Sequence, residues 1–79
     1  MSWKGAKKRK EINLKTGQNL KRIRKQQGLM QIDVAVATNL NSNYISRIET
    51  GKARITMSLL LQLVKGLGIT SGDLLEQNA

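Results

Sequence analysis

The segment from Gln31 to Gly51 constrains the fold more than any other part of the chain. Its pattern of apolar and polar residues predicts two short amphipathic helices, over residues 31–38 and 42–49, joined by a three-residue turn. In the second helix, which Asn41 can cap, Ile45 and Ile48 lie three residues apart and form a narrow inward stripe. The opposite face carries short amides and hydroxyls and one guanidinium, from Ser42, Asn43, Ser46 and Arg47. Side chains of these kinds complement base edges in the major groove of DNA.

Three further helices are expected on either side of this pair. Residues 16–27 show helical spacing, and Gly28 can end that helix in a left-handed conformation. Thr56 can cap a helix over residues 57–67, with its inward stripe formed by Met57, Leu60, Val64 and Leu67. Residues 70–73 match a capping box that opens a short helix through about residue 77. No stretch alternates like a strand, so the chain is expected to be all-α with five helices.

The first 15 residues differ in composition from the rest. Residues 1–10 hold five of the fourteen basic residues and show no apolar periodicity. This pattern predicts a flexible basic arm over residues 1–15, followed by one domain over residues 16–79. Such an arm is either a solubilising tail or a segment that lies along phosphates or enters a minor groove.

Composition excludes several classes of function. The chain of 79 residues suffices for one small core, which must be aliphatic because Phe is absent. Without Cys or His it lacks the commonest metal ligands, and its five carboxylates follow no catalytic or metal-binding pattern. We therefore expect no enzyme activity, no metal and no cofactor, and the sequence indicates no small-molecule effector. Neither a bilayer-spanning run nor a signal peptide is present, so a cytoplasmic, nucleoid-associated protein is expected.

The net charge indicates a polyanionic partner. Fourteen Lys and Arg against five Asp and Glu give +9, with an isoelectric point near 10.6. A nucleic acid and an anionic membrane surface both fit this charge. A membrane-surface peptide also needs a broad apolar face beside its basic residues, and the arm has none.

Four fragments of the chain, in their order and spacing, resemble the Cro and phage-repressor type of helix-turn-helix domain, the XRE family of bacterial regulators. They cover residues 17–24, 28–31, 44–51 and 67–75. The size and the basic arm also resemble the controller proteins of restriction–modification systems. The resemblance implies a phage-repressor-like domain of five helices that binds double-stranded DNA through its second and third helices.

The resemblance also implies roles for individual residues. Ser42, Asn43 and Arg47 would face base edges, with Ser46 nearby. Phosphate contacts would come from Gln31, Thr50, Lys52 and Arg54. Tyr44 fits equally a phosphate contact through its hydroxyl and a ring packed at the edge of the domain. Arg24 and Glu49 each adjoin an inward apolar residue, and because these positions pair in the family, the resemblance implies a structural ion pair between them.

Three positions depart from the family pattern. Met30 stands where a Ser or Thr usually caps the second helix, which would cost about 1 kcal/mol. Asn39 replaces the usual turn glycine, and Asn tolerates a positive φ better than any residue except Gly. Ile55 and Leu59 are apolar where the family is commonly polar or has Pro.

A homodimer that binds a two-fold symmetric operator is the expected assembly, because one recognition helix reads only a few base pairs. Ile55, Leu59 and Leu63 recur every four residues and form a second apolar stripe, which we expect at the dimer interface. An antitoxin-type or other protein-binding module built on the same domain is the alternative function. The five helices are expected to consume the chain, however, and to leave no extension that could wrap a partner enzyme.

Overall fold

The described part of the protein consists of five α-helices: α1 (Ser2–Gln26), α2 (Gln31–Thr38), α3 (Ser42–Glu49), α4 (Met57–Leu67) and α5 (Ser71–Leu75). The computed structural model describes the backbone of residues 2–76 and the side chains of residues 9–76. Within the described backbone there is no strand, as the sequence predicted. None of these helices is both long and apolar enough to cross a bilayer.

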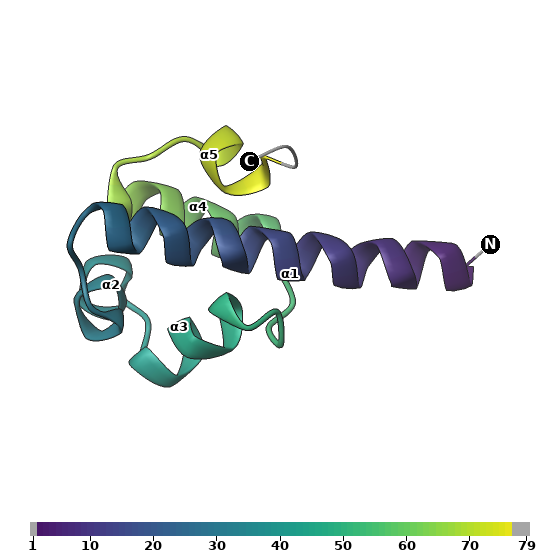
Figure 1. Ribbon diagram of the computed structural model, residues 1–79, viewed down its shortest axis with the longest axis horizontal. Helices are drawn as coiled ribbons and strands as arrows, with labels where there is room; N and C mark the ends of the chain where they lie inside the picture. Colours follow the sequence, from purple (N-terminus) through teal and green to yellow (C-terminus); the bar gives the residue numbers. More distant parts are fainter. Residues whose placement is uncertain (1, 77–79) are drawn as a thin grey trace.

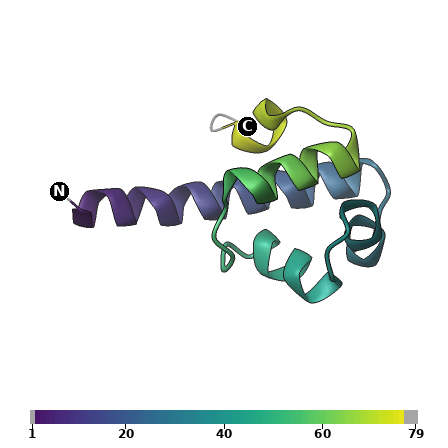
Figure 2. The ribbon, with the colours of Figure 1, turned by 180° about the vertical axis from the view of Figure 1, so that it is seen from behind.

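The long helix α1 extends along the whole length of the molecule (Figure 1). It packs against α3 on one side and α5 on the other, while α4 contacts α2 and α5. In the view from behind, α4 lies in front of α1 and runs in nearly the same direction (Figure 2). The N-terminal half of α1 projects beyond the other helices along the longest dimension of the molecule, 39 Å.

Side-chain caps fix the starts of three helices where the sequence predicted them. The Asn41 side chain accepts the Tyr44 N–H at 2.7 Å, and the Thr56 hydroxyl accepts the Leu59 N–H at 3.1 Å. Thr70 and Asp73 form the expected capping box, with bonds of 3.2 and 3.0 Å. Met30 provides no side-chain cap, although the Asp33 carboxylate accepts its N–H at 2.8 Å. Each cap satisfies an N–H that a helix leaves unpaired.

A close backbone approach joins α1 to α3. A side chain at Gly17 would collide with the Ile48 carbonyl oxygen, so glycine lets the two helices touch. A second approach joins α4 to α2, because a methyl group at Gly66 would lie 2.6 Å from the Ala37 carbonyl oxygen. The turn between α2 and α3 contains Asn39 with φ of 60°, the positive value expected for it.

The start of α1 corrects the prediction for the N-terminal segment. The helix begins at Ser2 rather than near residue 16, so residues 2–15 are helical and are not a flexible arm. This stretch contains Ala, Lys, Arg, Glu and Leu, which favour helices, and each residue added to a formed helix gains a hydrogen bond. The Asn13 carbonyl side-chain oxygen also accepts the Ile55 N–H at 3.2 Å. The helix therefore crosses the predicted domain boundary without a break.

The inward face of α4 also differs from the prediction. Met57, assigned to the core, is 69 % exposed, whereas Leu59 and Leu63, assigned to an outward stripe, are 5 % and 0 % exposed. Leu60 and Leu67 are buried as predicted. The helix lies between α2 and α5, so a broad face rather than a single stripe must turn inward. Leu residues at 59, 60, 61 and 63 allow two overlapping stripes, and periodicity alone cannot choose between them.

Candidate nucleic-acid interface

The exposed face of α3 has the register predicted from its apolar residues. Ile45 and Ile48 are fully buried in the aliphatic core. Asn43 and Arg47 are exposed on the outer side of the helix, and Ser42 and Ser46 are half-buried beside them. With α2, this helix forms one edge of the molecule, away from α5 (Figure 1). The four polar side chains thus belong to one accessible face of a short, capped helix.

Arg47 is held at the C-terminal end of α3. Its Nη2 donates to the Lys52 carbonyl oxygen at 3.2 Å, while the Lys52 N–H donates to the Arg47 carbonyl oxygen at 2.8 Å. One of the five guanidinium N–H groups is used in this way, which leaves donors for a ligand. A guanidinium so restrained loses less side-chain entropy when it forms a two-pronged hydrogen bond.

A polar network around Glu49 ties α3 to α1 and α2. The Glu49 carboxylate accepts Arg24 Nε at 2.7 Å and Arg24 Nη2 at 3.2 Å, which makes the ion pair two-pronged. The side chains of Arg24 and Glu49 are 12 % and 2 % exposed. Gln31 Nε2 donates to the same carboxylate at 3.1 Å, and Arg24 Nη1 donates to the Leu29 carbonyl oxygen at 2.9 Å. A buried carboxylate satisfied in this way fixes the angle between helices more than it adds stability.

The residues assigned to phosphates occupy different environments. Lys52 and Arg54 are exposed in the segment after α3, where their charges are accessible. Gln31 is oriented by its bond to Glu49, which leaves one amide N–H of that group for another acceptor. Tyr44 is partly buried against the core, which favours a packing role for its ring. The Thr50 hydroxyl lies 3.0 Å from the Ser46 carbonyl oxygen, so its hydrogen is already engaged.

The proposed dimer stripe is not a surface in this structure. Leu59 and Leu63 belong to the core, and Ile55 is half-buried with its N–H bonded to Asn13. The apolar side chains exposed on α4 are instead Met57 at 69 % and Leu61 at 47 %. They are four residues apart and share one face of the helix.

Asn19 is a structural residue that the sequence interpretation missed. It is 2 % exposed, and its Nδ2 donates to the carbonyl oxygens of Leu74 and Glu76, both at 2.8 Å. These bonds fasten the C-terminal end of α5 to α1. The signal was present in the sequence, because Asn19 adjoins Leu20 on the inward side of α1 and a buried amide needs backbone partners.

Comparison with known proteins identifies the family. A family model described as helix-turn-helix matches residues 20–74, which include all of α2, α3 and α4. The chain belongs to the helix-turn-helix family. The helix-turn-helix match begins at Leu20 and therefore leaves out most of the basic helix α1.

Two curated relatives share about a third of their residues with this helix-turn-helix chain. Control protein C.MunI of a Mycoplasma species is 35 % identical over 65 residues, covering 81 % of this chain and 88 % of the relative. An HTH-type transcriptional regulator of Sinorhizobium fredii is 31 % identical over 58 residues, covering 73 % of this chain and 75 % of the relative.

Solved structures of helix-turn-helix proteins have the same fold. The restriction–modification controller protein C.AhdI from Aeromonas hydrophila superposes with a TM-score of 0.77 at 28 % identity, covering 82 % of this chain and 94 % of that one. The restriction–modification controller protein C.Esp1396I gives a TM-score of 0.74 at 32 % identity, covering 82 % of this chain and 84 % of that one.

Proposed function

We propose that the protein is a transcriptional regulator that binds double-stranded DNA at specific sites through α3. The observation that carries the proposal is the outer face of α3, with Ser42, Asn43, Ser46 and Arg47 held in register by two buried isoleucines. Helices of this kind present short polar side chains to base edges in the major groove. A regulator of this kind works in the cytoplasm, at the nucleoid.

Selection of binding sites from a random pool of duplex DNA tests this function. A specific regulator should enrich a consensus, and a homodimer should enrich two half-sites related by two-fold symmetry. A pool that shows no enrichment after repeated rounds, with a protein that is folded by circular dichroism, would refute sequence-specific binding.

A homodimer completes the proposal, because two recognition helices are needed to read a full operator. Since Leu59 and Leu63 are buried, the surface we assign to the dimer is centred on Met57 and Leu61 of α4. Replacing Leu61 by Glu should shift the protein toward monomer in sedimentation equilibrium, because the interface would then bury a charge. Val36→Glu is a matched control, since Val36 is 77 % exposed on α2. If L61E remains a dimer at the wild-type concentration, α4 does not provide the interface.

The finer proposal is that the protein is the controller of a restriction–modification system. It is supported by the similarity to C.MunI and by the fold shared with C.AhdI and C.Esp1396I. The selected consensus should then occur upstream of genes for a restriction endonuclease or its controller in the source genome. A consensus found only upstream of unrelated genes would point to a general regulator.

A further inference from the structure

The positive charge of the protein is concentrated on one helix. Ten of the fourteen Lys and Arg lie in α1, together with a single carboxylate, Glu11. The rest of the chain has four basic and four acidic residues. The net charge of +9 therefore belongs to α1, whereas the part that contains α2 and α3 is neutral as a whole.

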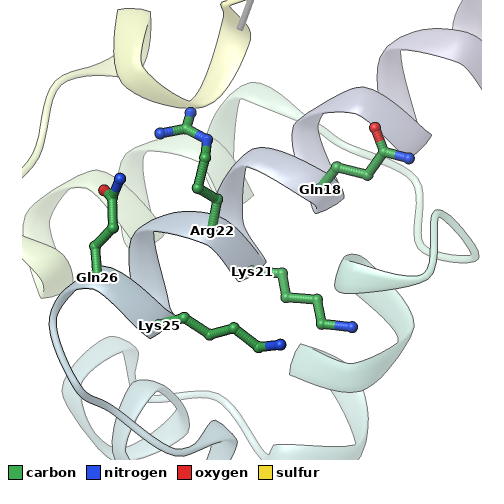
Figure 3. Close-up of a pocket in the computed structure, with 5 residues that line it drawn as sticks. All are labelled: Gln18, Lys21, Arg22, Lys25 and Gln26. Carbon is green, nitrogen blue, oxygen red and sulfur yellow. The ribbon is translucent and has the colours of Figure 1, made fainter.

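Three cations of α1 form a compact group on its outer face, which we call the α1 strip: Lys21, Arg22 and Lys25. Together with Gln18 and Gln26 they line a shallow hollow of about 540 Å³ (Figure 3). All three are exposed to solvent. The lining residues are all polar or charged, although the surface that they turn toward the hollow consists mainly of the apolar stems of their side chains.

None of the described carboxylates forms an ion pair with the α1 strip. Glu49 is engaged by Arg24 and Gln31, Asp33 and Asp73 cap helices, and the exposed Glu76 after α5 makes no ion pair with these cations. Glu11 precedes Lys21 by ten residues, or about 15 Å along the helix. The strip therefore has uncompensated charge, which makes it attractive to a polyanion.

The strip lies beside the recognition helix. Lys21 is one turn from Gly17, which touches α3 at Ile48, and three residues from Arg24, which pairs with Glu49. The side chains of Lys21 and Lys25 extend toward the side of α1 where α3 lies, and Arg22 extends toward α5 (Figure 3). A duplex bound to α3 would consequently bring its flanking sugar–phosphate backbone toward Lys21 and Lys25.

We propose that the α1 strip is a second DNA contact, which holds the sugar–phosphate backbone flanking the site that α3 reads. This inference rests on the proposed DNA-binding function. The strip is made of Lys and Arg with no aromatic or short hydrogen-bonding side chain among them, so it adds affinity without reading sequence.

The test compares two duplexes that carry the consensus selected from the random pool: one without flanks and one with about ten extra base pairs at each end, roughly one helical turn. The triple variant Lys21→Gln/Arg22→Gln/Lys25→Gln should match the wild type on the short duplex and bind the long one more weakly. Each phosphate contact contributes about −0.9 to the slope of log affinity against log salt. Raising the salt from 50 to 200 mM should therefore weaken wild-type binding, relative to that of the variant, by roughly 3.5-fold per contact, or about 12-fold for Lys21 and Lys25, which extend toward the side of α3.

Two control variants distinguish a loss of affinity caused by the strip from one caused by misfolding or by lower total charge. Arg22 Nη2 lies 3.3 Å from Asn19 Oδ1, so the double variant Lys21→Gln/Lys25→Gln leaves that contact and the attachment of α5 intact. Lys65→Gln removes one exposed charge from α4, and its effect should be smaller than that of Lys25→Gln.

The outcomes distinguish this inference from the proposed function. If the triple variant keeps the wild-type affinity and salt slope on the long duplex, the strip is an ordinary solvated face and the inference is overturned. An equal loss on both duplexes would overturn the assignment to flanking DNA. A wild type that selects no consensus would instead refute the proposed function itself.

Discussion

Helices α1 and α3 touch each other but differ sharply in charge. Ten basic residues and one carboxylate lie in α1, whereas α3 has only Arg47 and Glu49, and the latter is buried in an ion pair with α1. Phosphates attract any cation, but bases are distinguished only by side chains of suitable shape and hydrogen-bonding pattern. The contrast supports our proposal that attraction to DNA and discrimination among sequences belong to different helices.

The largest expected effect comes from breaking the connection between these helices. Glu49→Ala would leave the Arg24 guanidinium without its carboxylate in a largely buried position, which should lower the free energy of unfolding by about 3 kcal/mol. Urea denaturation followed by circular dichroism measures this change. Glu49→Gln keeps the shape and should cost less. A loss under about 1 kcal/mol for the alanine variant would mean that the pair behaves as a surface contact.

The next largest effect should distinguish base recognition by α3 from phosphate binding in the segment that follows it. Arg47→Ala should weaken binding to the selected site by about 1–3 kcal/mol and relax the preference at one base pair, since a guanidinium can bind a guanine in two-pronged fashion. Lys52→Ala should weaken binding to the selected site and to random DNA by similar factors. Fluorescence anisotropy on matched duplexes measures both. If the two variants lower affinity in the same sequence-independent way, Arg47 does not contact a base.

The smallest expected effect concerns the buried side of α1. Thr16 is fully buried, and its hydroxyl has no hydrogen-bond partner within the described side chains. Thr16→Val removes this hydroxyl and should raise the free energy of unfolding by about 1 kcal/mol, without changing DNA affinity. Thr38→Val is the matched control, because the Thr38 hydroxyl donates to the Val34 carbonyl oxygen at 2.7 Å. Equal changes in the free energy of unfolding of the two variants would mean that the unpaired hydroxyl of Thr16 does not destabilise the fold.

The sequence predicted the parts of the fold that depend on local chemistry. Asn41, Thr56 and Thr70 cap helices where expected, and Asn39 has the positive φ that its turn position required. In α3 two isoleucines leave only one possible inward side, so the polar face followed from the sequence. The Arg24–Glu49 pair came from the family resemblance, and the structure contains it.

The errors arose where several arrangements satisfy the same local pattern. Periodicity could not choose between the leucine stripes of α4, because that choice depends on where α2 and α5 pack. The charged start of α1 lacks an apolar stripe, yet its residues favour a helix and extend one that the core already anchors. The inward position of Asn19 beside Leu20 indicated a buried amide, but its partners in α5 lie 55 and 57 positions away along the chain, so local sequence could not identify them.

The contact of Gly17 with Ile48 has a consequence for how DNA is distinguished. Because the backbones of α1 and α3 meet without an intervening side chain, the two helices form one stiff unit with no room to slide. The free protein then offers the same shape to every duplex it meets. Adjustment during binding falls to the DNA, whose resistance to bending and twisting depends on its sequence. Base pairs that no side chain touches can therefore contribute to the choice of site.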